Sequence, residues 1–136
     1  MATPTNTVTL LSRLAYAAKK SRVSILWAEP LTPNGIDLLA KLYDLGVLQH
    51  IEREAGGFRL FLKYVAGRPA ARIHPFVNTG RGRHYASCKI MEEIAAHNGG
   101  STFLISTDRG ILTHHECLAQ RCGGYILTAV LFTAVK

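Results

Sequence analysis

The sequence predicts an α/β fold of the α+β kind, built from two small packed domains. Apolar residues make up 48% of the 136 residues, which is enough to bury a core. Stretches with the spacing of amphipathic helices alternate with short stretches typical of strands. Gly67-Arg68-Pro69 interrupts this pattern and is typical of a joint between domains. We therefore expect an N-terminal domain over residues 1–66 and a C-terminal domain over residues 67–136.

The N-terminal domain is expected to begin with a helix, a strand and a second helix. Residues 7–21 have helical spacing, and residues 23–27 (VSILW) predict a short strand. Residues 31–46 predict the second helix, because Pro33 lies near its start and Gly46 just past its end. The apolar positions expected on the inner faces are Val8, Leu11, Leu14, Ala15 and Ala18 in the first helix, and Ile36, Leu39, Leu42 and Tyr43 in the second.

The rest of the N-terminal domain predicts a β-hairpin. Residues 47–54 and 58–65 flank the turn-forming stretch Ala55-Gly56-Gly57. Apolar residues at alternate positions from Phe58 to Leu62 predict one buried face in the second arm. The expected order is helix, strand, helix, strand, strand, arranged as a sandwich in which one face of the sheet is covered.

The C-terminal domain predicts a main helix and mainly antiparallel strands. Residues 71–77 are expected to be extended, with Pro75 placing them at a sheet edge or a bulge, and residues 78–85 to form a basic loop. Ser87 is the expected cap of a helix over residues 87–100, whose inward residues are Met91, Ile94 and Ala95. The other expected elements are a strand at 102–107, a turn at 108–110, a short helix entry at 111–122, and one long apolar strand or a pair of strands at 125–135.

Positive charge is concentrated in two blocks that lack acidic residues. The chain carries a net charge of +7, with +4 in residues 1–28 and +7 in residues 55–91, whereas residues 29–54 carry −3. Such blocks favour partners rich in phosphate, such as nucleic acid. No apolar run reaches the roughly 18 residues of a membrane span. Three cysteines are an odd number and do not predict a disulfide framework, which favours a reducing compartment.

The stretch STDRGILTHHE (106–116) raises the question of an active site or a metal site. Thr113 and Glu116 have the spacing of a capping box just before an apolar helical stretch. This explains Glu116 without catalysis and leaves His114 and His115 in an exposed first turn. Catalysis by these two histidines together with Glu116 and Cys117, as in a small metal-dependent hydrolase, stays open as an alternative.

Zinc binding is the second alternative for this stretch. His114 and Cys117 are three residues apart, and Cys122 could supply a third ligand. The spacing matches neither C-x₂-C nor H-E-x-x-H, and Cys117 lies in the apolar register of its helix, where a core position is expected. We therefore expect no metal, no other cofactor and no enzymatic activity.

The chain resembles one known family over about residues 8–135. STDRGILT (106–113), followed by Gly123-Gly124 and a final strand, resembles the signature of the eighth protein of the small ribosomal subunit. Four further stretches are similar to that family in the same order, namely LLSRLAYA (10–17), LAKLYDLGVLQHI (39–51), LFLKYVAGRP (60–69) and Arg83-x-Tyr85. The resemblance implies two small α/β domains, of which the C-terminal one holds the main RNA surface.

This resemblance also implies the partners. They are a helix in the central domain of small-subunit ribosomal RNA, whose assembly the family supports, and neighbouring small-subunit proteins, with no membrane. Small hydroxyl side chains, glycines and free amides suit the shallow minor groove of RNA, while basic residues position phosphates. The residues expected to bind RNA are Ser106, Thr107, Asp108, Arg109, Gly110, Thr113, Gly123, Gly124, Tyr125, Arg83, Tyr85, Arg81, Arg68, Lys89, Arg13, Lys19, Lys20 and Arg22.

The chain departs from the usual family pattern at several of these positions. Asp108 replaces the usual Ser, Tyr125 replaces the Glu after Gly-Gly, Arg121 replaces the Gly that ends the helix, and Tyr16 replaces an Asn. A carboxylate near phosphate needs neutralising, for which Arg109 is the expected partner. The Asp108 and Tyr125 departures resemble mitochondrial members, so a mitochondrial ribosome is expected. A cytoplasmic ribosome of bacterial type and a non-ribosomal RNA- or DNA-binding module are the alternatives.

Overall fold

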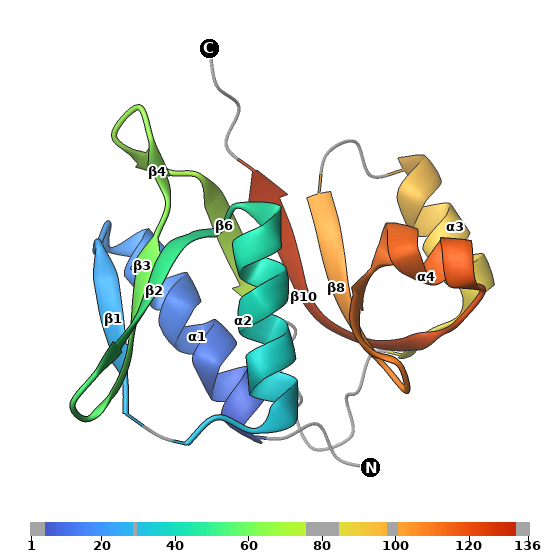
Figure 1. The fold of residues 1–136 in the computed structure, drawn as a ribbon. Coiled ribbons are helices and arrows are strands. Elements are labelled where there is room, and N and C mark those ends of the chain that lie inside the picture. Colours follow the sequence, from blue (N-terminus) through green and yellow to red (C-terminus); the bar gives the residue numbers. More distant parts are fainter. Residues whose placement is uncertain (1–4, 29, 76–84, 98–100, 133–136) are drawn as a thin grey trace.

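The computed structural model describes residues 5–28, 30–75, 85–97 and 101–132 (Figure 1). Within these residues the helices are α1 (Thr5–Lys19), α2 (Pro33–Leu45), α3 (Cys88–His97) and α4 (His114–Gln120). The strands are β1 (Ser24–Trp27), β2 (Leu48–Glu54), β3 (Gly57–Leu62), β4 (Tyr64–Val65), β5 (Arg68–Pro69), β6 (Ala71–Pro75), β7 (Tyr85–Ala86), β8 (Ser101–Thr107), β9 (Gly110–Thr113) and β10 (Gly124–Phe132). None of the described helices has the length and apolar character needed to span a membrane. This mixture of helices and mainly antiparallel sheets confirms the predicted α+β class.

The first sheet has the order β1-β3-β2 and is antiparallel throughout. The β2–β3 hairpin turns at the predicted glycines, where Glu54 pairs with Gly57. In β1, Trp27 is fully buried whereas Leu26 is 42% exposed, as expected for a sheet covered on one face. Helix α1 contacts β1 and helix α2 contacts β2, so both helices pack on this sheet.

The second sheet has the order β6-β10-β8-β9, and β7 also pairs with β10. Strand β6 lies at the edge, which confirms the placement predicted from Pro75. Residues 124–132 form a single long strand, β10, whose register with β8 shifts between Ile126 and Thr128. Helix α4 contacts β8 and β9, and α3 packs on α4, so these helices cover the right-hand side of the sheet in Figure 1.

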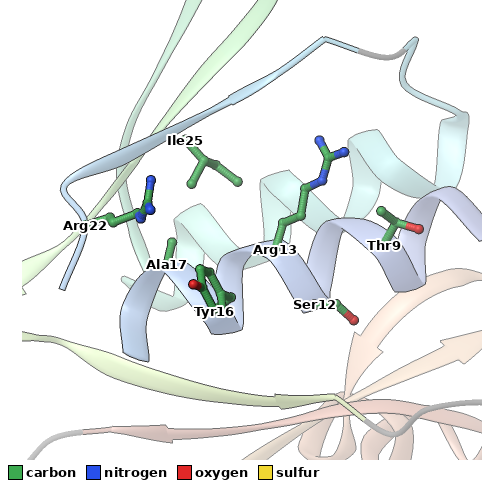
Figure 2. A pocket seen from close by; sticks show the side chains of 7 residues that line it. All are labelled: Thr9, Ser12, Arg13, Tyr16, Ala17, Arg22 and Ile25. Carbon is green, nitrogen blue, oxygen red and sulfur yellow. The ribbon is translucent and has the colours of Figure 1, made fainter. Parts of the chain in front are cut away.

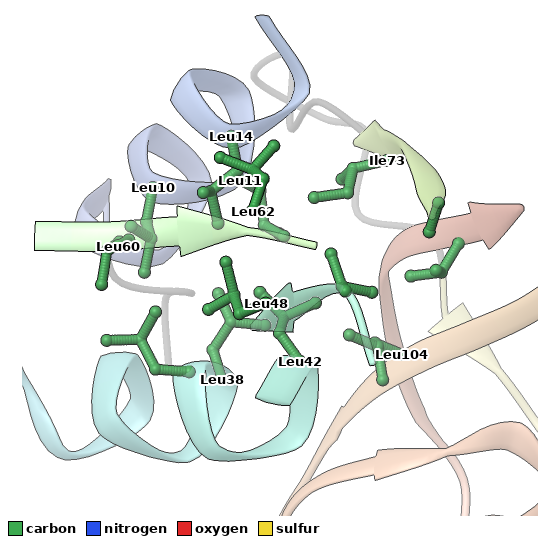
Figure 3. Packing of buried hydrophobic residues seen from close by; sticks show 14 of the residues in the cluster. Leu10, Leu11, Leu14, Leu38, Leu42, Leu48, Leu60, Leu62, Ile73 and Leu104 are labelled. Carbon is green, nitrogen blue, oxygen red and sulfur yellow. The ribbon is translucent and has the colours of Figure 1, made fainter. Parts of the chain in front are cut away.

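One hydrophobic cluster joins the two sheets (Figure 3). It combines leucines of α1, α2, β2 and β3 with Ile73 of β6, Leu104 of β8 and Val130 of β10. A smaller cluster of Ala86, Met91, Ile105 and Cys117 joins α3 and α4 to β7 and β8. The shared cluster fixes the orientation of the two sheets by packing, because a close-packed interior resists sliding. The division at residues 66 and 67 stays a prediction.

The buried face of α2 differs from the predicted one. Ile36 and Tyr43 are 55% and 53% exposed, and the buried residues of the helix are Gly35, Leu38, Leu39 and Leu42. Leu39 and Leu42 were predicted correctly. Successive helical residues are rotated by about 100°, so Ile36 and Leu38 cannot both face the sheet. Packing of α2 against β2, β9 and α1 selects which of its two apolar stripes is buried.

Several local predictions are confirmed or corrected by the remaining elements. Gly46 ends α2 in the left-handed conformation with φ 86°, as the sequence indicated. The amide of Ile90 donates to Ser87 Oγ at 3.3 Å, which confirms the cap of α3. Residues 111–113 belong to strand β9 and not to a helix, because they pair with β8.

In α1, Leu11, Leu14 and Ala18 are buried as predicted, and Leu10 and Ala17 join them. The basic loop from Asn78 to His84, with Arg81 and Arg83, lies outside the described residues, as do Asn98-Gly99-Gly100 and the side chain of Val8.

Candidate nucleic-acid interface

The β8–β9 turn contains the first part of the proposed interface. Thr107 pairs with Gly110, which leaves Asp108 and Arg109 exposed at the tip. The Thr107 hydroxyl donates to the Gly110 carbonyl at 2.8 Å and accepts from the Arg109 amide at 3.0 Å. Gly110 has φ 103°, which favours glycine. The side chain of Thr107 therefore shapes the turn from within, while Asp108 and Arg109 are presented to solvent.

Arg109 is oriented by helix α4. Its Nη1 donates to Gln120 Oε1, near the end of α4, at 3.0 Å. The guanidinium has five N–H donors, so this contact leaves others free to meet a phosphate or a base. The expected pairing of Arg109 with Asp108 is replaced here by a contact that holds Arg109 against α4.

Thr113 and Glu116 form the predicted capping box at the start of α4. The Glu116 amide donates to Thr113 Oγ1 at 3.1 Å, and the Thr113 amide donates to Glu116 Oε1 at 2.9 Å. Lys41 of α2 donates to the same Oε1 at 2.8 Å. Burial alone would raise the pKa of Glu116, but the hydrogen bonds from Lys41 and Thr113 outweigh it and hold the pKa below its ordinary value. The cap therefore also ties α4 to α2, and Thr113 itself is only 7% exposed.

His114 is buried, which corrects the prediction of an exposed first turn. It is 1% exposed, and its Nδ1 accepts from the Phe103 amide of β8 at 3.1 Å. Its ring also lies edge-on to the Phe103 ring, with the centroids 5.7 Å apart. Burial and the neighbouring His115 lower the pKa of His114. His114 is therefore a neutral core residue at pH 7, whereas His115 is exposed as predicted.

The thiol of Cys117 is buried, as the apolar register predicted. The residue is fully buried, and burial together with the nearby Cys122 raises its pKa to about 12. Such a thiol stays protonated at neutral pH and is a poor nucleophile. Among the described residues, no group of three or more His, Cys, Asp or Glu side chains is arranged to hold a metal ion.

Two tyrosines meet at the same end of the second sheet. Tyr125 of β10 pairs with Ser106 of β8 on one side and with Tyr85 of β7 on the other. The tyrosine rings lie edge-to-face with centroids 5.2 Å apart, and they are 55% (Tyr85) and 36% (Tyr125) exposed. An exposed aromatic pair beside the β8–β9 turn offers a surface on which an unpaired base can stack.

Gly123 and Gly124 are explained by packing inside the protein. A Cβ atom at Gly123 would lie 2.6 Å from the Tyr85 hydroxyl oxygen, and one at Gly124 would collide with the Ser106 carbonyl. The sequence had suggested that these glycines allow RNA to approach. The structure shows that they let β7 and β8 approach β10, which brings Tyr85, Tyr125 and Ser106 together.

A second surface, which is basic, lies on α1 (Figure 2). A groove of about 350 Å³ is lined by Thr9, Ser12, Arg13, Tyr16, Ala17, Arg22 and Ile25. The Arg13 guanidinium lies 5.0 Å from the centroid of the Trp27 ring, and the Lys20 ammonium lies 5.7 Å from that of Tyr16. Charge alone predicted Arg13, Lys19, Lys20 and Arg22. It gave no signal for Ser12, Tyr16 or Ile25.

Two other predicted basic residues, Lys89 and Arg68, lie within the described part of the chain. Lys89 is exposed in the first turn of α3, and Arg68 is exposed on β5, in the separate two-stranded β4–β5 sheet. The structure thus brings together Ser106, the β8–β9 turn, Gly123-Gly124, Tyr85 and Tyr125. It does not bring Arg68 to them.

Comparison with known proteins identifies a family. The family model "Ribosomal protein S8" matches residues 9–131. The chain is 32% identical over 120 residues to small ribosomal subunit protein uS8 of Brucella ovis, covering 87% of this chain and 89% of that protein. It is 29% identical over 96 residues to small ribosomal subunit protein uS8m of Acanthamoeba castellanii, covering 70% and 76%. It is 26% identical over 125 residues to uS8 of Erythrobacter litoralis, covering 89% and 92%.

Proposed function

The chain belongs to the ribosomal protein S8 family, a family of non-enzymatic proteins of the small ribosomal subunit, and we propose that it binds a helix in the central domain of small-subunit ribosomal RNA. In this role it organises that domain during assembly of the subunit for translation. The observation that carries the proposal is the convergence of Ser106, Tyr85, Tyr125 and the β8–β9 turn at one end of the second sheet.

The physical fit of this end of the sheet is to an irregular A-form helix. The minor groove of RNA is wide and shallow and presents 2′-hydroxyls, which short side chains and backbone groups can reach. Ser106 supplies such a short side chain, and the β8–β9 turn supplies such backbone groups. Where a bulge exposes a base, the ring of Tyr85 or Tyr125 supplies a stacking face.

Asp108 has a specific place in this proposal. At the exposed tip of the turn, its carboxylate accepts a hydrogen bond from a 2′-hydroxyl or from a base amino group. Arg109, held by Gln120, stays beside the tip and supplies donors to the neighbouring phosphate. The pair thus combines one acceptor for the groove with one cation for the backbone.

The basic residues provide affinity that does not depend on sequence. Arg81, Arg83 and Lys89 serve the C-terminal surface, and Arg13, Lys19, Lys20 and Arg22 form a second contact along α1. Arg68 on the β4–β5 sheet meets phosphate outside these two surfaces. Each cation that neutralises a phosphate releases counterions, so binding should weaken steeply with salt.

A mitochondrial ribosome is the proposed location. The support is the relative named uS8m, together with Asp108 and Tyr125 at positions where the chain departs from the usual family pattern. Bacterial relatives match at similar identity, so a cytoplasmic ribosome of bacterial type is the alternative. Gradient sedimentation of mitochondrial and cytosolic fractions separates the two, because the chain should co-sediment with the mitochondrial small subunit.

The test of RNA binding uses two RNA fragments at several salt concentrations. We expect the purified chain to bind the central-domain helix more tightly than a perfect duplex of equal length. Equal affinity for both RNAs would contradict recognition of that helix. Absence from ribosomal gradients would instead favour a non-ribosomal nucleic-acid-binding module.

A further inference from the structure

Helix α2 presents an apolar stripe to solvent. Ile36, Ala40 and Tyr43 follow the i, i+4, i+7 spacing of one helical face, and all three are exposed. Ile36 is 55% and Tyr43 is 53% exposed, although the same helix buries Leu38 and Leu42 on its other side. Large apolar side chains that are this exposed and lie in line on a helix are typical of an interaction surface.

The charges beside this stripe are acidic. Asp37 and Asp44 are exposed and lie two helical turns apart, next to the stripe. The cation of the same helix, Lys41, is paired with Glu116 at 2.8 Å. Residues 29–54 form the most acidic block of the sequence, at −3, between the blocks of +4 and +7. Carboxylates that are not neutralised repel phosphate, so this face suits RNA poorly.

We propose that the exposed face of α2 docks a basic, amphipathic segment of a neighbouring small-subunit protein. Apolar side chains of the partner pack on Ile36, Ala40 and Tyr43, and its Lys or Arg residues pair with Asp37 and Asp44 at the rim. Tyr43 is the expected anchor, because tyrosine contributes a large, rigid and amphipathic contact area. This inference rests on the proposed function, since it takes the partner from within the same subunit.

The docking face borders the RNA-facing turn. Lys41 joins α2 to Glu116 of α4, and α2 also contacts β9. A Cβ atom on Gly110 would lie 3.1 Å from Asp37 Oδ2. A protein on α2 would therefore sit beside the β8–β9 turn, and protein and RNA would meet this chain on adjacent surfaces.

Photo-crosslinking in assembled small subunits tests the nature of the partner. The chain carries benzoylphenylalanine in place of Tyr43, or in place of Tyr85 as the control, and subunits are purified before irradiation. We expect the position-43 adduct to resist nuclease and to contain a Lys- and Arg-rich peptide, and the position-85 adduct to contain RNA. RNA at position 43, an acidic peptide there, or no adduct there while position 85 reacts would each overturn the proposal.

The position-85 control also separates the two proposals. If the chain failed to enter small subunits, or if position 85 gave no RNA adduct, the proposed function would fail first. If position 85 crosslinked to RNA and position 43 gave no basic peptide, only the docking proposal would fail.

Substitutions on α2 test the energetics with the peptide identified by crosslinking. Ile36→Ser combined with Tyr43→Ser should weaken binding of that peptide on the order of tenfold or more, because two apolar anchors are lost. Ile90→Ser, at an exposed apolar position on α3, is the matched control and should leave peptide affinity unchanged. RNA affinity should be the same in all variants. Unchanged peptide affinity in the double variant would overturn the proposal.

A charge reversal tests the rim. Asp44→Lys should slow association with the basic peptide and flatten its salt dependence, whereas Glu92→Lys on α3 should do neither. An equal effect of the two reversals would show that only net charge matters and would remove the acidic rim from the proposal. Circular dichroism of each variant confirms that exposed substitutions leave the fold intact.

Discussion

The end of the second sheet and the face of α1 are two surfaces that meet RNA in the proposed function, and they are built differently. At the sheet end, Thr107 bonds within the turn, Arg109 bonds to Gln120, and Tyr85 packs against Tyr125. On α1, Arg13 and Arg22 line a groove, and the charged ends of Arg13 and Lys20 lie over aromatic rings. Fixed, short groups suit the recognition of shape, whereas flexible cations suit attraction to any phosphate. In the proposed function, the charge pattern of the sequence therefore reveals the α1 surface, whereas only the packing of distant strands reveals the surface at the sheet end.

Leu104→Ala should have the largest effect, because it should disable both surfaces together. Leu104 is fully buried in the cluster that joins the two sheets. We expect a loss of about 2–5 kcal/mol in the free energy of unfolding, measured by urea denaturation. If only the C-terminal signals melted earlier in a residue-resolved experiment, the two sheets would be independent and the predicted division at residue 66 would be supported.

Removing the tyrosine rings should distinguish the sheet end from α1. Tyr125→Ala or Tyr85→Ala should each weaken binding to the central-domain helix by about 1–3 kcal/mol if a base stacks there. Affinity for a perfect duplex should hardly change. Tyr85→Phe keeps the ring and is the control for lost hydroxyl contacts. Equal losses on both RNAs would assign the tyrosines to general affinity.

Thr107→Val should act through the shape of the turn. The substitution keeps the volume and loses two hydrogen bonds, to Gly110 and from Arg109. We expect a loss of about 1 kcal/mol in stability, and weaker binding of the specific RNA because the tip loses its fixed geometry. Ser106→Ala serves as the comparison in titrations with both RNAs. Unchanged affinity of Thr107→Val for the specific helix would show that the turn does not read it.

Arg83→Ala tests the phosphate-binding part of the comparison. We expect weaker binding to all RNAs and a salt slope that is flatter by roughly one unit, because one cation is lost. Arg22→Ala, on the α1 surface, should likewise weaken binding to all RNAs and flatten the salt slope. Fluorescence anisotropy over a salt series measures both slopes. A sequence-dependent loss in Arg83→Ala would move this residue from phosphate contact to base recognition.

The smallest expected effect concerns pH and His114. The ordinary pKa is 6.5 and the folded pKa is lower. Below pH 6.5 the unfolded chain gains a proton that the folded chain does not, so the free energy of unfolding falls as the pH drops toward the folded pKa. Above pH 6.5 both forms are neutral and the contribution to pH dependence vanishes.

His114→Asn should remove this part of the pH dependence, because asparagine keeps an acceptor for the Phe103 amide and does not titrate. Urea denaturation between about pH 5 and pH 7 measures it. His115→Asn, at the exposed neighbour, should change the profile less. A wild-type profile retained in His114→Asn would assign the pH dependence to other groups.

The local features of this protein can be predicted from short stretches of its sequence. The capping box of Thr113 and Glu116, the glycine stop at Gly46, the Ser87 cap, the hairpin near Gly56 and the edge strand at Pro75 were all predicted. Each of these features depends on backbone geometry and on side chains within a few residues of one another. The residues adjacent in the sequence are therefore enough to predict it. The family signature at 106–113 is local in the same sense.

Which face of each helix and strand is covered depends on how distant segments pack. His114 became a core residue because its ring packs on Phe103 of β8, and Ile36 and Tyr43 were left exposed because Leu38 and Leu42 face the sheet. Tyr85 and Tyr125 met because β7 and β8 both pair with β10, across forty residues of chain. These outcomes depend on contacts between distant segments, and periodicity within one segment leaves more than one face available for them.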